Sequence, residues 1–299
     1  MDKTMKSGSN RTHVASTVGA LLIWSTSFIG TKIAFASFPP ITLGTARFIV
    51  ASVVLGFLVL IKKEFIKPGT KDMRVIALSG VLGITVYFTM ENIGVKLTSA
   101  INAALIVASY PAITTLLELL IYRQKPSLYK LTGIAVAVAG VYLVSYTEGS
   151  IHAANQLAGN IILIATGIVW AFYNFTTRKV VSKYPAITFS FYQTVIGTVC
   201  FIPLAFLELD KWTPPNAITL SALLYLGIFC SVAAFMLYNF GLRKLSASTA
   251  VSLMNLVPIF GAVFSILCLH EPISLRQIAG GAIVIAGVML SVKQKKKIK

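Results

Sequence analysis

Ten apolar stretches, each long enough to cross a lipid bilayer, make up most of this 299-residue chain. A transmembrane helix needs about 20 mainly apolar residues, and the connections between the stretches are too short for a soluble domain. Only 12% of the residues are charged, against about 25% in an ordinary globular domain. The chain is therefore predicted to be an all-α integral membrane protein with ten transmembrane helices, at residues 14–36, 41–61, 75–95, 98–122, 130–146, 157–177, 186–207, 217–241, 247–268 and 276–292.

The basic residues gather on one side of these stretches. With the N-terminus in the cytoplasm, 21 Lys and Arg residues fall on the cytoplasmic side and three on the other, while Lys32 and Arg47 lie within spans. Cytoplasmic loops carry an excess of Lys and Arg, so both termini are predicted to be cytoplasmic and the chain to lie in the plasma membrane. This distribution accounts for the net charge of +17 without nucleic acid as a partner.

No catalytic or cofactor motif accompanies the spans. The sequence contains no H-E-x-x-H, no G-x-S-x-G and no phosphate-binding loop, so neither enzymatic activity nor ATP-driven transport is expected. Cys200, Cys230 and Cys268 are far apart in apolar runs and are predicted to be small buried hydrophobic residues rather than metal ligands. We expect no metal and no cofactor.

The two halves of the chain repeat one another at a nearly constant offset. A shift of 146 residues aligns Trp24 with Trp170, and a shift of 147 aligns Pro111 with Pro258. Because each unit has five spans, an odd number, the second copy enters the membrane from the opposite face. Such inverted-topology repeats are typical of secondary transporters. The predicted organisation is a basic cytoplasmic tail at 1–13, a first five-helix repeat at 14–148, a second at 157–292 and a basic cytoplasmic tail at 293–299.

Both halves contain short motifs in the same order. They are Leu22–Phe28, Pro39-Pro40 with Arg47-Phe48, Lys96–Ala100 with Pro111, Leu245–Ala247 with Pro258, and His270–Ser274. Together with the ten spans, these motifs resemble the EamA-type branch of the drug/metabolite transporter superfamily. The resemblance covers residues 14–292 and implies a central cavity walled by helices 1, 3, 4, 6, 8 and 9. It also implies export of amino acids, other small metabolites or toxic amphipathic compounds. The chain departs from the pattern at Gln124, which stands where the second half has Glu271.

Charged side chains within the spans need a partner, because a charge at mid-bilayer costs about 2.5–3.5 kcal/mol on insertion scales. Lys32 lies near a helix end, from which its long stem can reach the interface. Arg47 lies too deep for that, and Glu91 is predicted to pair with Arg47 or Lys32. This pair is either purely structural or takes part in ion coupling or in binding a substrate charge.

Uncharged polar and aromatic residues near the middle of the spans predict a pocket for a small amphipathic ligand. Individually, each aromatic residue could instead pack or anchor at the interface, and the amides could hydrogen-bond between helices. Pro111 and Pro258 are predicted to kink their helices. Small residues on one face of helices 5 and 10, around Gly140 and Gly287, predict close packing within the chain or between the subunits of a homodimer. The predicted pocket residues are Trp24, Ser27, Asn102, Tyr110, Trp170, Tyr173, Asn174, Tyr238, Asn239 and Asn255.

Together these features favour a secondary active transporter embedded in the lipid bilayer. It would export a small molecule such as an amino acid or a related amphipathic compound by alternating access between the two repeats. Two alternatives stay open: a multidrug-type exporter of aromatic or cationic compounds, and a facilitative uniporter.

Overall fold

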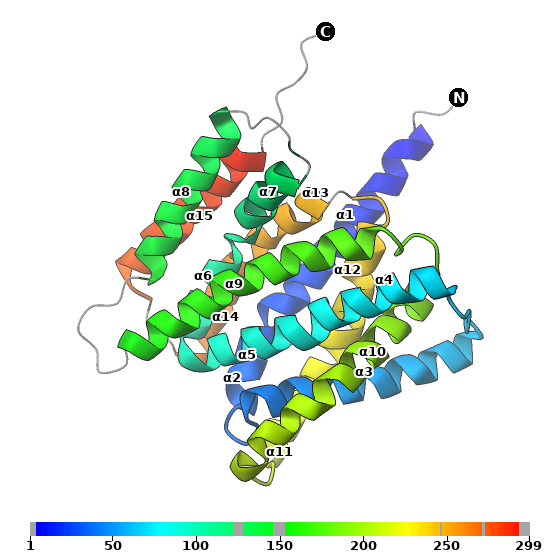
Figure 1. Cartoon of the computed structure of the whole chain (residues 1–299). Coiled ribbons are helices and arrows are strands. Elements are labelled where there is room, and N and C mark those ends of the chain that lie inside the picture. The colour runs from blue at the N-terminus through cyan, green and yellow to red at the C-terminus, as the bar shows by residue number, and fades with distance from the viewer. Residues whose placement is uncertain are drawn as a thin grey trace.

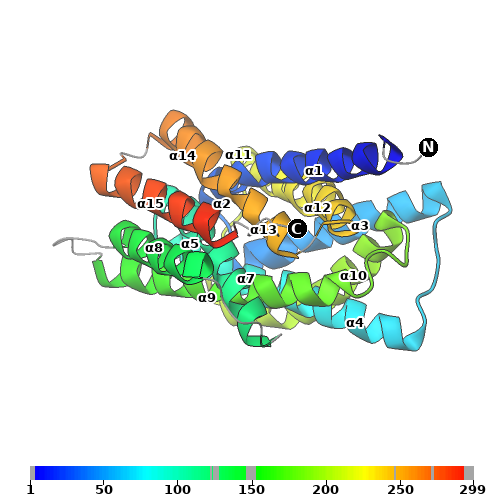
Figure 2. The same ribbon diagram turned by 90° about the horizontal axis from the view of Figure 1, so that it is seen from above.

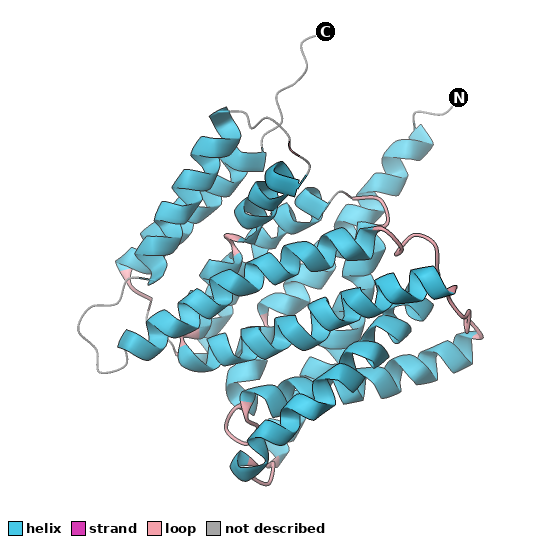
Figure 3. Cartoon of the chain, viewed as in Figure 1, coloured by secondary structure: helices cyan, strands magenta, loops and turns pink. Residues whose placement is uncertain are grey.

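The computed structural model describes residues 4–121, 123, 128–145, 153–245, 247–270 and 273–292. Every regular element in these ranges is helical, as predicted (Figure 3). Eight helical segments of the described chain are long and apolar enough to cross a membrane: Arg11–Ala34, Pro40–Lys62, Thr70–Leu97, Ala100–Ile121, Ala154–Arg178, Ala186–Lys211, Ala217–Leu242 and Thr249–Cys268.

Two shorter apolar helices lie where the fifth and tenth spans are expected. Their apolar stretches run from Leu131 to Val144 and from Leu275 to Leu290. The first belongs to α8 (Leu128–Ser145) and the second to α15 (Leu275–Val292), each of 18 residues. Asn255 has a described backbone but no described side chain, and Gln124 and Glu271 lie outside the described residues.

Most of the long segments are interrupted rather than continuous. The first half contains α1 (Thr4–Ser25), α2 (Ser27–Ala34), α3 (Pro40–Lys62), α4 (Thr70–Gly80), η1 (Val81–Val86), α5 (Tyr87–Leu97), α6 (Ala100–Val107), α7 (Tyr110–Ile121) and α8. The second contains α9 (Ala153–Arg178), α10 (Ala186–Ala205), η2 (Phe206–Lys211), α11 (Ala217–Tyr225), η3 (Leu226–Ala233), α12 (Ala234–Leu242), α13 (Ala247–Ser252), η4 (Leu253–Asn255), α14 (Leu256–Leu269) and α15.

The interruptions recur at matching places in the two halves. The π-helical turns η1 and η3 both end at residues related by the offset of 147, Val86 and Ala233. The break between α6 and α7 directly precedes Pro111, and the 3₁₀ turn η4 precedes Pro258. π-turns within α-helices are frequent at functional sites. The halves therefore share their irregular backbone as well as their sequence.

Helices of the first half pack on helices of the second half throughout the bundle. The main pairs are α3 with α10, α5 with α9, α1 with α12 and α6 with α14 (Figures 1 and 2). Small residues permit this: a Cβ added at Gly80 would lie 2.4 Å from the carbonyl oxygen of Gln193, and one at Gly197 would lie 2.7 Å from that of Gly80. Close backbone approach at small residues is the usual basis of helix packing in membranes.

The small-residue faces of α8 and α15 pack on each other within the chain. The two helices run side by side at one edge of the bundle (Figures 1 and 2). A Cβ added at Gly140 would lie 2.6 Å from the Val284 nitrogen, and one at Gly287 would lie 2.4 Å from the Ala137 nitrogen. This face is therefore occupied within the subunit, and a homodimer would need another surface.

The prediction for the cysteines is correct for one and wrong for two. Cys230 is buried, whereas Cys200 and Cys268 are exposed on the outer faces of their helices. An apolar helix of a membrane protein is apolar on its lipid-facing side as well, so the surrounding sequence alone does not separate the two environments.

One end of the bundle, here called the basic end, comprises the start of α1, the connections at 63–69 and 179–185 and the end of α12. Hydrogen bonds and ring contacts join these segments. The Lys183 ammonium donates to Asp72 at 2.8 Å, Arg243 donates to the Tyr184 carbonyl oxygen, and His13 stacks on Phe240 with ring centroids 4.4 Å apart. The segments therefore meet at one end of the helices.

The other end, called the opposite end, contains the connections at 35–39, 98–99 and 206–216. Glu208 accepts hydrogen bonds from the Thr42 backbone nitrogen at 2.8 Å and its hydroxyl at 3.0 Å. Trp212 donates to the same hydroxyl at 2.9 Å. A carboxylate at a helix N-terminus is stabilising, so Glu208 secures the start of α3.

Candidate functional site

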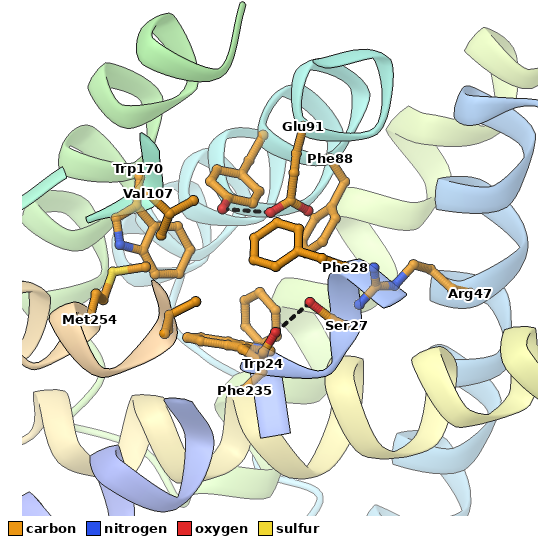
Figure 4. A pocket seen from close by; sticks show the side chains of 12 residues that line it. Trp24, Ser27, Phe28, Arg47, Phe88, Glu91, Val107, Trp170, Phe235 and Met254 are labelled. Carbon is orange, nitrogen blue, oxygen red and sulfur yellow. Dashed lines mark hydrogen bonds between the residues drawn. The ribbon is translucent and has the colours of Figure 1, made fainter. Parts of the chain in front are cut away.

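A cavity lies between the two halves (Figure 4). The first half contributes α1, α2, α3, α5 and α6 to its wall, and the second half contributes α9, α12, η4 and α14. Small-molecule sites are typically concave and lined by apolar and aromatic side chains with a few polar groups among them. The lining residues are Trp24, Ser27, Phe28, Arg47, Tyr87, Phe88, Glu91, Val107, Trp170, Phe235, Met254 and Val257.

Aromatic rings form most of the apolar wall. Trp24 and Trp170, the residues matched by the repeat, meet edge to face with ring centroids 5.6 Å apart. Trp24 also packs edge to face on Phe235 at 5.1 Å, and its indole nitrogen donates to the Cys230 carbonyl oxygen at 2.8 Å. These contacts fix the rings, so the wall presents a preformed apolar surface.

Arg47 brings a positive charge to the cavity from α3. Its side chain is 1% exposed, its Nε donates to the Ser231 hydroxyl at 2.9 Å, and its guanidinium lies 4.5 Å from the Phe88 ring centroid. The Nη2 atom is buried and has no hydrogen-bond partner among the described residues. Leaving a buried charged donor unsatisfied is costly, so this atom is suited to an acceptor supplied by a ligand.

Glu91 brings a negative charge to the same cavity from α5. Its side chain is 8% exposed, and Oε1 accepts a hydrogen bond of 2.9 Å from the Tyr87 hydroxyl. In the part of the chain that the structure describes, no Arg47 nitrogen lies within 4.0 Å of the Glu91 carboxylate. Lys32 instead donates to the Thr98 carbonyl oxygen at 2.5 Å. Arg47 and Glu91 thus face one cavity without direct ion-pair contact.

Four of the predicted pocket residues lie next to this cavity, in a buried polar layer on its basic-end side. The Tyr173 hydroxyl donates to Asn239 at 2.9 Å, and the Tyr238 hydroxyl donates to Asn174 at 2.8 Å. These groups satisfy one another, and none of the four is among the residues that line the cavity. We define the polar layer as Ser79, Tyr173, Asn174, Gln193, Tyr238 and Asn239.

Gln193 of α10 connects this layer to the first half of the chain. Its Oε1 accepts from Asn239 at 3.2 Å, and its Nε2 donates to the Ser79 hydroxyl at 3.0 Å. A continuous run of hydrogen bonds therefore crosses from α9 through α12 and α10 to α4.

Comparison with known proteins identifies the chain. The model of the EamA-like transporter family matches it twice, over residues 13–146 and 157–293. The chain belongs to this family.

Curated relatives agree with this assignment. An uncharacterized transporter of Archaeoglobus fulgidus is 30% identical over 287 residues, covering 94% of this chain and 97% of the relative. A probable terminal-alkyne amino-acid exporter of Streptantibioticus cattleyicolor is 27% identical over 271 residues, covering 90% of each. A crystal structure superposes with a TM-score of 0.68 at 18% identity, over 93% of this chain and 97% of the other. The relatives are named as transporters, and this EamA-like chain is a multi-span membrane transporter.

Two further predicted pocket residues of this EamA-like transporter lie outside the cavity wall. Asn102 donates to the Thr98 hydroxyl at 3.3 Å and accepts from Gln277 at 2.7 Å, which ties α6 to α15. Tyr110 is buried and donates to the Leu163 carbonyl oxygen at 3.1 Å. Both connect helices in this conformation. Of the predicted pocket residues, Trp24, Ser27 and Trp170 line the cavity.

The sequence reasoning missed most of the apolar wall of this EamA-like transporter. The repeat contained a signal for part of it, because the offset of 147 pairs Phe88 with Phe235 and Val107 with Met254, and all four line the cavity. Apart from the repeat, the sequence does not distinguish an apolar residue that lines the cavity from one that faces lipid or another helix.

Proposed function

We propose that this EamA-like transporter is a secondary active exporter of small zwitterionic metabolites, above all apolar α-amino acids. One observation carries the proposal: Arg47 and Glu91 face a largely aromatic cavity without pairing directly with each other. The partly satisfied guanidinium and carboxylate suit a ligand that carries both charges.

A zwitterion complements this arrangement group by group. A carboxylate accepts from Arg47 Nη2, which has no partner in the described chain, and hydrogen bonds between charged groups are stronger than neutral ones. An ammonium group donates to Glu91, whose Oε1 already accepts from Tyr87. The apolar side chain then packs on Trp24, Trp170 and Phe235.

The multidrug-type alternative accounts for less of the cavity. An exporter of cations would use Glu91, but Arg47 would repel its substrate. Two matched halves favour alternating access over a permanent pore, and a facilitative uniporter would share that mechanism. The name of the Streptantibioticus relative, a probable amino-acid exporter, supports the zwitterion.

The proposed topology has ten spans in two inverted repeats, 14–148 and 157–292, with α8 and α15 as the fifth span of each. The excess of Lys and Arg at the basic end supports a cytoplasmic location for that end and for both termini. In this orientation the transporter sits in the plasma membrane and exports its substrate from the basic end to the opposite end.

The test is transport by the purified protein in proteoliposomes, with leucine, leucinamide and 4-methylpentanoate as probes. Leucinamide lacks the carboxylate and 4-methylpentanoate lacks the amino group, so each loses one charged contact. We expect saturable leucine flux, with each analogue competing at least about tenfold more weakly. Absence of flux for every amino acid and aromatic amphipath in either direction would refute transport of this class. Equal competition by leucinamide would refute zwitterion recognition alone.

A further inference from the structure

The offsets that relate the two halves also relate the cavity to the polar layer. Arg47 plus 146 is Gln193, and Glu91 plus 147 is Tyr238. The two charged residues of the cavity thus have neutral hydrogen-bonding counterparts in the second half. Each counterpart belongs to the polar layer.

Two further polar positions are related in the same way. Ser27 plus 146 is Tyr173, and Asn92 plus 147 is Asn239. Ser27 lines the cavity and Asn92 follows Glu91 in α5, while Tyr173 and Asn239 hydrogen-bond each other at 2.9 Å. Four residues of the polar layer are therefore the second half's counterparts of polar residues at or beside the first half's part of the cavity wall.

The polar residues of the first half and their counterparts in the second half differ in whether other protein groups supply their hydrogen-bond partners. In the first half, Arg47 Nη2 is buried without a partner in the described chain. In the second half, Tyr173, Tyr238, Asn239 and Gln193 bond one another or their neighbours and are at most 1% exposed. The first-half polar groups border the cavity between the halves, whereas their second-half counterparts close on one another.

The layer lies directly against the cavity on the basic-end side. Trp170, at the cavity wall, stacks on Tyr173 with centroids 4.8 Å apart. Tyr238 packs on Trp24 at 5.1 Å and on Trp170 at 5.4 Å. Along the chain, Tyr173 is five residues from the end of α9 and Asn239 three from the end of α12, both at the basic end. The layer therefore lies between the cavity and the basic end of these helices.

We propose that the polar layer is the closed form of a second substrate site, which opens to the basic end when the first cavity closes. This inference rests on the proposed alternating access. The site takes the same zwitterion through neutral groups, with Gln193 in the place of Arg47 and Tyr238 in the place of Glu91. Opening separates the hydrogen bonds that now join α9, α10 and α12, and the substrate replaces them.

The test uses thiol labelling from each face of the membrane. In a chain freed of native cysteines by Cys200→Ala, Cys230→Ser and Cys268→Ala, Ser79→Cys places a reporter in the layer. Labelling by a membrane-impermeant maleimide is timed in right-side-out and inside-out vesicles. Tyr173→Phe, which removes the bond to Asn239, should speed labelling from the basic end about fivefold and leave labelling from the opposite end unchanged. Saturating leucine should slow the faster labelling again.

The control is Thr198→Val, which removes a buried and a partly buried hydrogen bond between α10 and α3. It should leave labelling of the reporter unchanged. Equal labelling rates in the Tyr173→Phe protein and its parent would overturn the inference, as would acceleration without protection by leucine. Leucine flux is measured on the same preparations and on the native chain. Absence of flux in the native chain counts against the proposed function, whereas normal flux in the native chain with unchanged labelling counts against the second site alone.

Discussion

At the scale of single residues, Arg47 should determine carboxylate recognition. Arg47→Gln removes the charge and the donor at Nη2, so leucine affinity should fall about 10- to 100-fold, since hydrogen bonds to charged groups contribute about 1.5–3 kcal/mol. Arg47→Lys keeps the charge but loses the planar contact with Phe88. Its leucine affinity should therefore lie between that of the native protein and that of Arg47→Gln. Isothermal titration of the purified proteins measures both. Arg243→Gln, a change to a half-buried arginine at the basic end, is the control, and unaltered binding by Arg47→Gln would contradict the prediction.

Glu91 should recognise the amino group and nothing else of the ligand. Glu91→Gln should weaken leucine about tenfold, because the ammonium loses its charged acceptor. It should not weaken 4-methylpentanoate, which has no amino group and is repelled by the native carboxylate. Competition binding with the two ligands gives the comparison. Glu208→Gln, at a buried carboxyl that secures α3, should change neither affinity. A parallel loss for both ligands in Glu91→Gln would show a structural role instead.

The residues also show how far sequence reasoning reaches. It found the charges at Arg47 and Glu91, because any charge inside a span needs a reason. It could not tell that Tyr173 and Asn239 hydrogen-bond each other, since these two residues lie 66 positions apart in the sequence and on separate helices. Polarity within a span predicts that a side chain avoids lipid. It does not predict whether that side chain faces a cavity or another protein group.

At the scale of helices, the contact between α8 and α15 depends on glycine. In Gly287→Ala the new Cβ would lie 2.4 Å from the Ala137 backbone nitrogen, so the helices must separate. Overpacking of this kind typically costs about 1–3 kcal/mol, which should appear as a lower midpoint in thermal unfolding. Gly69→Ala is the matched control, because its Cβ would meet nothing within 4 Å and its φ of −62° suits alanine. Equal midpoints for the two variants would contradict the close contact.

Helix positions were predictable because apolar length is a strong signal, and Pro111 and Pro258 mark the interruptions beside them, but the π-turns carry no comparable sequence signal. Nothing in the stretch around Gly83 or Gly227 marks the π-turns η1 and η3 before the structure is known. Those turns depend on packing between halves: a Cβ at Gly83 would lie 2.2 Å from the Tyr173 ring, and one at Gly227 would lie 2.7 Å from Val50. Because the two halves repeat one another, a break found in one half predicts a break at the matching position of the other half.

At the scale of the whole molecule, the number of spans depends on whether α8 and α15 cross the bilayer. Each has 18 residues, which at about 1.5 Å per residue gives about 27 Å, close to the ~30 Å thickness of the hydrocarbon core. If α8 crosses, the segments that flank it lie on opposite faces of the membrane. If it does not, they lie on the same face. The inverted repeat requires the crossing, because a unit of four spans would give two parallel halves.

Cysteines introduced on either side of α8 distinguish these two topologies. In the cysteine-free chain, Arg123→Cys precedes α8 and Asn155→Cys follows it, both at exposed positions. With ten spans, an impermeant maleimide should reach Arg123→Cys from the same face as Lys244→Cys, at the basic end, and Asn155→Cys from the same face as Asn216→Cys, at the opposite end. Labelling of Arg123→Cys and Asn155→Cys from one face would leave a first unit of four spans and two parallel halves. The exchange of roles between the cavity and the polar layer would then lose its structural basis, because two parallel copies cannot open to opposite faces by the same movement.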